Sequence, residues 1–129
     1  MLKELWDKGL AVRKEVLGAE YVERNLKAAD DFNMPMQELV TQSCWGWLWA
    51  RPQLPRKMRS LVNLGLLSAL NRPHEFKTHV KGALTNGCTR EEIREVLLQV
   101  AVYCGMPAGV EAFRLAREAI AEHEGAKRA

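Results

Sequence analysis

Residues 55–70 read PRKMRSLVNLGLLSAL, and this stretch decides the fold class. It begins with a proline, and its apolar residues recur at three- and four-residue steps on nearly every side. That period is typical of an α-helix, and a helix without a polar face is buried on several sides. We therefore expect a central helix from Pro55 to about Leu70, with other helices packed around it.

Breaks between further helical segments recur along the rest of the chain. The apolar period stops at Gly18, resumes near Glu20, and is interrupted at residues 30–33, 51–55, 71–73, 86–87 and 105. Glycine and proline end helices because glycine tolerates positive φ and proline lacks a backbone donor. No stretch alternates with a period of two for long enough to form a strand. We predict one all-α domain, residues 1–129, with about six helices.

Local signals mark several helix ends. Residues 89–92, TREE, fit a capping box in which Thr89 caps forward and Glu92 reaches back. Pro73 suits the first position of a helix, and Asn33 is a predicted N-cap. In the helix after Asn33, we expect an apolar stripe of Met36, Leu39, Val40, Cys44, Trp47 and Leu48.

The charge balance argues against several classes of partner. With 19 Lys and Arg against 16 Asp and Glu, the net charge is +3, whereas nucleic-acid-binding domains are strongly basic on one face. The longest apolar run, residues 64–70, is far shorter than the ~20 residues of a membrane-spanning helix. The charged N-terminal residues are not typical of a signal peptide. We expect a cytoplasmic protein that binds a small anion, and neither nucleic acid nor a membrane.

Three tryptophans lie within five residues, at Trp45, Trp47 and Trp49. A chain of this length struggles to bury so much apolar surface alone, and large exposed apolar patches mark interfaces. We therefore predict a homo-oligomer, with active sites near subunit boundaries.

Arg72, Glu75 and His79 are spaced by three and then four residues, which places them on one stripe of a helix. A carboxylate beside an imidazole can orient the ring and raise its basicity, giving a group that exchanges protons near neutral pH. The alternative is a surface salt bridge with a histidine beside it.

Other candidate site residues lie nearer the N-terminus and after the central helix. The stripe Glu38, Gln42, Trp45 and Trp49 offers a carboxylate beside aromatic walls, or else a solvated glutamate at the edge of an interface. Three further candidates are Arg51, Arg56 and Arg59. Arginine guanidinium groups suit carboxylate ligands. The alternative, which we favour for Arg56, is that the side chain only links two helices. Tyr103 can point a hydroxyl into a cleft, although a buried tyrosine is the commoner case.

Metal and thiol chemistry have little support in the sequence. Glu38, Glu75 and His79 lack any H-E-x-x-H spacing, so we predict no metal site. The three cysteines form no C-x-x-C pair, and we expect them to be small buried apolar residues. They are Cys44, Cys88 and Cys104.

Several segments together resemble the carboxymuconolactone decarboxylase family. They are residues 45–61, WGWLWARPQLPRKMRSL; the helix with Arg72, Glu75 and His79; and residues 89–99, TREEIREVLLQ, with 103–107, YCGMP. The similarity extends to residues 13–18 and 31–33, so it covers nearly the whole chain in order.

The resemblance implies the helical fold of the alkylhydroperoxidase D-like proteins and a homo-oligomer, commonly a hexamer (a trimer of dimers). It also implies decarboxylation without a cofactor. Peroxidase relatives carry C-x-x-C followed by a histidine, whereas Arg72 and Glu75 stand at the corresponding positions here and His79 is kept. Without the two thiols, disulfide chemistry is lost, and the histidine suits proton chemistry.

The reaction implied is the conversion of 4-carboxymuconolactone, a small anionic lactone, to the β-ketoadipate enol-lactone in aromatic catabolism. The lactone itself accepts the electrons, so the protein must hold two carboxylates, stabilise an oxyanion and deliver a proton. We assign the proton chemistry to His79, oriented by Glu75, and to Glu38. The predicted substrate-binding residues are Arg51, Arg59, Arg72, Tyr103 and Trp49.

Three alternatives stay open. Gln42, Ser43 and Trp47 depart from the more basic or polar character of the family, so the chain can be a paralogue acting on a related lactone or keto acid. The second alternative is a thiol-dependent, alkylhydroperoxidase-like peroxidase, which the missing C-x-x-C disfavours. The third is an oligomeric binding module without catalysis.

Overall fold

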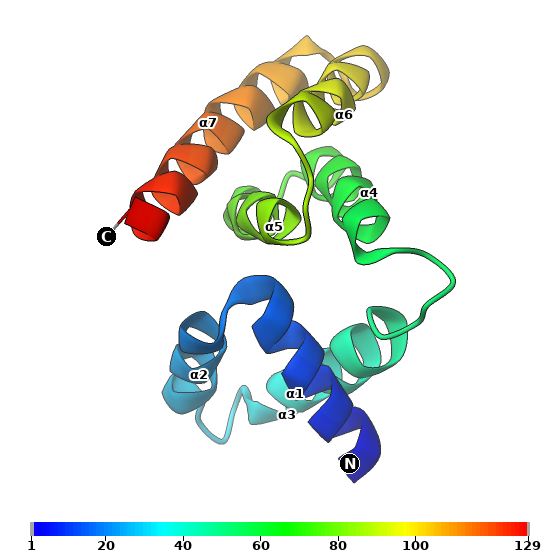
Figure 1. Ribbon diagram of the computed structural model, residues 1–129, viewed down its shortest axis with the longest axis vertical. Helices are drawn as coiled ribbons and strands as arrows, with labels where there is room; N and C mark the ends of the chain where they lie inside the picture. Colours follow the sequence, from blue (N-terminus) through cyan, green and yellow to red (C-terminus); the bar gives the residue numbers. More distant parts are fainter. Residues whose placement is uncertain (1, 129) are drawn as a thin grey trace. The chain divides into compact units, whose positions relative to one another are not determined.

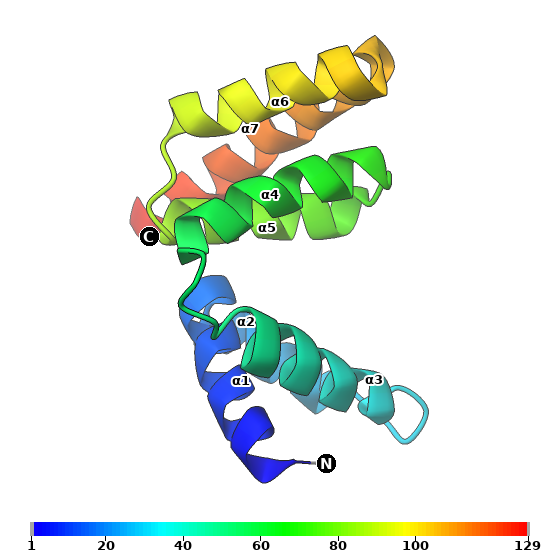
Figure 2. The same cartoon turned by 90° about the vertical axis from the view of Figure 1, so that its right-hand side faces the viewer.

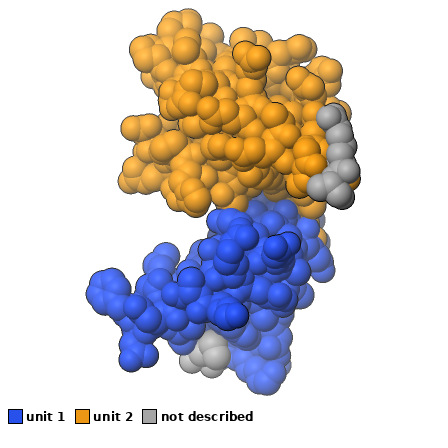
Figure 3. Space-filling view, turned by 90° about the vertical axis from the view of Figure 1, so that its left-hand side faces the viewer, with its two compact units in different colours: residues 1–55 blue, residues 56–129 orange. Residues whose placement is uncertain are grey.

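The computed structural model describes residues 2–128, which form seven α-helices, one π-helical segment and no strand (Figure 1). The all-α prediction is confirmed, with seven α-helices where the sequence predicts about six. Among these residues, no helix combines the length and the apolar character needed to cross a membrane. The chain divides into two compact units, residues 1–55 and 56–129, which are coloured separately in Figure 3.

The first unit is built around a close crossing of two helices. Its elements are α1 (Lys3–Leu17), α2 (Ala19–Ala28), α3 (Met34–Leu39) and the π-helix η1 (Val40–Leu48). The main packing of α1 is on η1. Gly9 of α1 and Gly46 of η1 make this contact possible, because a Cβ on either would overlap the backbone of the opposite helix.

The π-helix changes which side chains of its segment are buried. The predicted apolar stripe is wrong: Thr41, Trp45 and Trp49 are buried, whereas Met36 and Trp47 are exposed. Backbone hydrogen bonds in a π-helix join residues five apart, as from the Trp49 nitrogen to the Cys44 oxygen (2.9 Å), so a stripe of period 3.6 drifts off the buried face. Two of the three tryptophans therefore lie inside this unit, with the Trp45 and Trp49 ring centroids 4.9 Å apart.

The second unit is a four-helix bundle. Its elements are α4 (Arg56–Ala69), α5 (Pro73–Thr85), α6 (Arg90–Cys104) and α7 (Met106–Arg128). Helix α4 packs mainly on α5 and α6, and α7 also packs mainly on α5 and α6, with a smaller contact between α4 and α7 (Figure 2). The core includes Leu64, Phe76, Val80, Ile93, Leu97 and Leu115.

Most predicted helix ends are confirmed. The Thr89 hydroxyl accepts from the Glu92 nitrogen (3.0 Å), and the Glu92 carboxylate accepts from the Thr89 nitrogen (2.9 Å). Gly18 and Gly105 separate helices at φ of 95° and 108°, which residues with a Cβ rarely adopt. Asn33 is the N-cap residue of α3, as predicted, but its side chain makes no capping bond, because its oxygen accepts from the Asp30 nitrogen (2.8 Å).

The helix α4 is not enclosed as its sequence predicts. Its buried residues are Ser60 and Leu64, which face the bundle. Val62 and Leu66 are 52% and 53% exposed, and Met58 is also exposed. Three neighbouring helices cover only one side of α4, so its other apolar side is open in the single chain.

Candidate functional site

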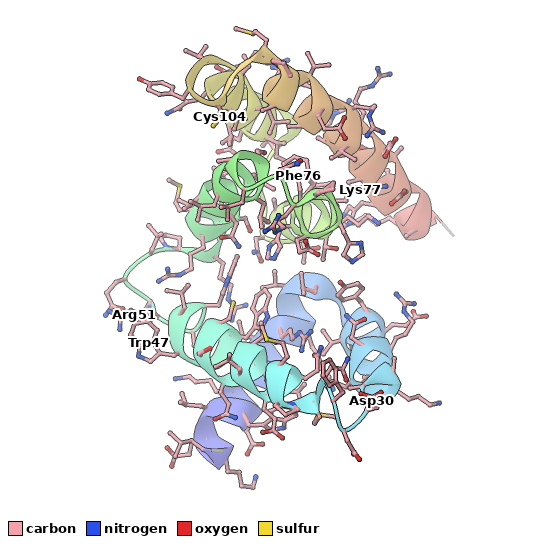
Figure 4. All side chains as sticks on the ribbon, turned by 180° about the vertical axis from the view of Figure 1, so that it is seen from behind. Asp30, Trp47, Arg51, Phe76, Lys77 and Cys104 are labelled. Atoms are coloured by element: carbon pink, nitrogen blue, oxygen red, sulfur yellow. The ribbon has the colours of Figure 1, made fainter. Side chains whose placement is uncertain are left out.

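The centre of the second unit's candidate site is His79, in the middle of α5. Lys77 and Lys81 on the same helix form ion pairs with Glu122 of α7, at 2.9 and 2.6 Å (Lys77 is labelled in Figure 4). Because successive helical residues turn by about 100°, these pairs place His79 on the side of α5 away from α7. The α5–α7 contact thereby fixes the direction in which the imidazole points.

Asn63 of α4 is one neighbour of the imidazole within this bundle. Its amide nitrogen lies 3.5 Å from Nδ1 of His79. When that amide donates, Nδ1 is the acceptor and the ring carries its proton on Nε2. Asn63 is not among the site residues predicted from the sequence, because its contact joins two helices. The sequence does contain one indication of Asn63, because it is the single amide side chain in the otherwise apolar residues 61–67.

Burial lowers the pKa of His79 to about 4, and the negative charge of Glu75 opposes this only in part. Glu75 does raise the basicity of the imidazole, as predicted, but burial outweighs it, so the expectation of a group that exchanges protons near neutral pH is wrong. Helical spacing predicts that the Glu75 carboxylate lies near His79. It does not predict the desolvation of the imidazole, which has the larger effect on its pKa. At neutral pH the imidazole is uncharged, so it can donate one hydrogen bond and accept another.

This lowered pKa predicts a loss of stability in mild acid. The unfolded chain binds a proton on His79 near pH 6.5, while the folded chain binds it near pH 4, so acidification across that window favours unfolding. The free energy of unfolding should fall by at most about 3 kcal/mol from pH 7 to pH 4 through this group. Thermal unfolding of His79→Gln should show a smaller fall than wild type. His74→Gln, on the same helix, is the control. An identical pH dependence in wild type and His79→Gln would contradict the prediction.

Arg59 lies one helical turn from Asn63, the residue that contacts His79. It is half-buried on α4, one turn before Asn63, so the two residues share a face of the helix. Glu75 is exposed, one turn before His79 on α5. The second unit therefore places a cation, an amide, an imidazole and a carboxylate along one side of α4 and α5.

Arg72 and Tyr103 lie in other parts of the second unit. Arg72 is the residue before α5 rather than a member of its stripe, and its Nη1 donates to the carbonyl oxygens of Leu70 (3.1 Å) and Asn71 (3.4 Å). It lines a hollow with Cys104, while Tyr103 is 83% exposed and lines a separate apolar groove between α4 and α6. The predicted stripe is wrong for Arg72, because the turn before Pro73 is not helical.

The predicted site residues of the first unit lie on α3, on η1 and just after it. Trp49 is buried in the core of that unit, and Glu38 is half-buried on α3. The guanidinium of Arg51 lies over the Trp47 ring, 5.0 Å from its centroid (Figure 4). The side-chain oxygen of Gln42 accepts from the Leu2 nitrogen (3.0 Å). π-Helical turns are rare and frequently occur at functional sites, which makes η1 a candidate segment.

Two of the three thiols, Cys44 and Cys88, have little nucleophilic character. Burial raises the pKa of Cys44 and of Cys88, so both are protonated at neutral pH. Cys104 is exposed, which corrects the expectation that all three are buried. Within residues 2–128, no three His, Cys, Asp or Glu side chains gather as metal ligands.

Comparisons with known proteins point to one family. The sequence profile of the carboxymuconolactone decarboxylase family matches residues 35–118. The chain is 48% identical over 118 residues to a nitrosuccinic acid decarboxylase of Metarhizium robertsii, covering 92% of this chain and 82% of that protein. It is 40% identical over 116 residues to a 4-carboxymuconolactone decarboxylase of Acinetobacter baylyi, covering 90% and 87%. Over 44 residues it is 41% identical to a 4-carboxymuconolactone decarboxylase of Pseudomonas putida, covering 34% and 92%.

Proposed function

Because the chain belongs to the carboxymuconolactone decarboxylase family, we propose that it is a carboxy-lyase that removes CO2 from a small dicarboxylate without a cofactor. One observation carries the proposal. Two relatives that each match at least nine tenths of the chain are both named as decarboxylases, although their named substrates differ.

The two named substrates share one chemical logic. In 4-carboxymuconolactone, the departing carboxylate leaves an electron pair that is conjugated to the lactone carbonyl. In nitrosuccinate, the pair left beside the nitro group moves onto the nitro oxygens. In both compounds a second carboxylate is retained. The C–C bond to the departing carboxylate breaks, CO2 leaves, the substrate's own oxygens take up the electron pair, and one proton adds to carbon.

The residues of the candidate site suit this reaction. We assign His79 to the developing oxyanion and to the proton that reaches carbon, and Asn63 to holding the imidazole with its proton on Nε2. An uncharged imidazole that carries its proton on Nε2 can donate a hydrogen bond from that nitrogen, and donors already aimed at a developing oxyanion contribute most to such reactions. The negative charge of a bound dicarboxylate raises the proton affinity of the ring, which favours proton uptake before transfer to carbon.

The remaining assignments concern the carboxylates of the substrate. We propose Arg59 and Arg51 as their cationic partners, since guanidinium forks bind carboxylates at two points. Glu38 is the second proton-handling group. The peroxidase alternative loses support, because the pKa values of Cys44 and Cys88 are raised rather than lowered.

The test is a direct comparison of substrates. Purified protein is incubated separately with 4-carboxymuconolactone and with nitrosuccinate, and CO2 release is measured together with the organic product. Turnover of either compound supports the proposal, and the larger kcat/KM identifies the better substrate. Consumption of hydroperoxide that depends on a cysteine would instead favour a peroxidase, and binding without turnover would favour a binding module.

We also propose that the chain forms a homo-oligomer through the open apolar side of α4 and α6. Met58, Val62 and Tyr103 line the groove between these helices. Val102 is exposed on the same part of α6. A second copy of the chain is the occupant that the symmetry of most soluble oligomers favours.

Val62→Asp should therefore shift the molar mass toward that of a single chain. A carboxylate that enters an apolar interface is desolvated without a partner, which opposes association. Light scattering during size-exclusion chromatography measures the mass. Ala121→Asp, at an exposed position of α7, should leave the mass unchanged. An oligomer of unchanged size in Val62→Asp would exclude this face as the interface.

A further inference from the structure

The loop between α2 and α3 carries an exposed aromatic side chain beside two aspartates. Phe32 is 93% exposed, and Asp30 and Asp31 are also exposed (Asp30 is labelled in Figure 4). One carboxylate oxygen of Asp30 accepts from the backbone nitrogens of Phe32 (3.0 Å) and Asn33 (3.3 Å), which fixes the shape of the loop. The ring is therefore presented by an ordered segment, so little chain entropy is lost when a partner covers it.

A hollow in the second unit has the opposite charge. It lies between α6 and α7 and has a volume of about 380 Å³, and its apolar lining includes Ile93, Leu97 and Phe113. Three arginines and one glutamate provide its charged lining. They are Arg90, Arg94, Arg117 and Glu91.

The charges of these arginines are only weakly compensated. Arg90 approaches Glu124 to 3.8 Å, and Arg94 approaches its neighbour Glu95 to 3.8 Å. Arg117 forms no ion pair with any side chain that the structure describes. Long ion pairs between exposed groups contribute little, so the hollow keeps an excess of positive charge that attracts an anionic partner.

We propose that Phe32 of one copy of the chain inserts into the α6–α7 hollow of a second copy, with Asp30 and Asp31 facing its arginines. The ring matches the apolar lining, and the aspartates match the sign of the arginines, which orients such a contact. The groove between α4 and α6 is lined by uncharged residues, so the aspartates favour the α6–α7 hollow over that groove. Because Phe32 is 93% exposed in the single chain, the loop does not fill the hollow of its own chain.

This contact differs in kind from the one proposed through α4 and α6. It joins two different surfaces, a loop of the first unit and a hollow of the second, so it is a heterologous contact. It goes beyond the proposed function and does not depend on it, because neither surface contains His79 or Asn63. A protein without decarboxylase activity could still make the contact.

The first arm of the test measures association of single variants. Sedimentation velocity over a dilution series gives the protein concentration at which half of the chains are associated. Phe32→Ala should raise that concentration at least about tenfold, because a buried aromatic anchor carries much of the energy of an interface. Asp31→Arg should also raise it at least about tenfold, because like charges then face each other. Glu20→Arg, an exposed charge reversal on α2, should behave like wild type.

The second arm mixes two variants that should each associate weakly. One is Asp31→Arg, and the other combines Arg94→Glu with Arg117→Glu, both at exposed positions of the hollow. In the mixture, the introduced arginine of one copy can face the introduced glutamates of the other. The mixture should therefore associate at a lower concentration than either variant alone. Circular dichroism should show the wild-type helix content in every variant.

Several results would overturn the inference. A wild type with the mass of a single chain at every concentration is one. Unchanged association in both Phe32→Ala and Asp31→Arg is another, and it would leave the contact through α4 and α6 as the only interface. A mixture that associates no better than its components also counts against the inference. If only the variant of the hollow associated weakly, the hollow would bind a different segment.

Discussion

The substitution His79→Gln is expected to lower kcat by about 10²–10⁴-fold, because a positioned proton-transfer group accelerates a reaction by about that factor. Glutamine keeps an amide that can occupy part of the imidazole volume, but it cannot take up and release a proton. KM should change much less, since the carboxylates are assigned to arginines. Steady-state CO2 release from whichever dicarboxylate the wild type turns over measures the effect.

The control for this variant lies on the same helix. His74 is exposed in the first turn of α5, and His74→Gln should retain wild-type kcat. Circular dichroism and molar mass should be unchanged in both variants, which separates catalysis from folding and assembly. Near-wild-type turnover in His79→Gln would show that the proton comes from another group, such as Glu38.

Gly9→Ala should produce the largest loss of stability in the first unit. A Cβ at Gly9 would overlap the carbonyl oxygen of Thr41, a backbone atom that cannot move without shifting η1. Forcing helices apart typically costs about 3 kcal/mol, which corresponds to a fall of about 10 °C in Tm for a chain of this size. One turn further along α1, Nη1 of Arg13 donates to the Thr41 hydroxyl (3.2 Å), and the separation should also disturb this bond.

A second glycine provides the matched control. Gly125 lies in α7, and a Cβ there has no atom outside its own helix within 4 Å. Gly125→Ala should leave Tm unchanged or raise it slightly, because alanine favours a helix over glycine. Differential scanning calorimetry of both variants measures the contrast. Equal Tm values for Gly9→Ala and wild type would mean that α1 and η1 do not pack this closely.

The helix boundaries were predictable because local chemistry determines them. Gly18, Gly105 and the Thr89 capping box act over a few residues, and the structure confirms all three. The π-helix was not predictable, because an expected period of 3.6 assigns the wrong residues to the buried face. Trp45 shows the consequence, since it lies outside the predicted stripe and inside the core.

The candidate site was predictable only where it follows helical spacing. The spacing places Glu75 one turn before His79, but burial by packing determines the pKa of the imidazole. Asn63 is found only through contact between α4 and α5.

The central claim is that this chain releases CO2 from a small dicarboxylate by proton chemistry without a cofactor. The most direct measurement is the initial rate of CO2 release from 4-carboxymuconolactone and from nitrosuccinate, using wild-type protein that has been treated with a chelator and dialysed. The account predicts turnover of at least one compound at a rate proportional to protein concentration, with one solvent proton incorporated at carbon. No CO2 above the uncatalysed rate from either compound, or activity that returns only when a metal is added back, would contradict it.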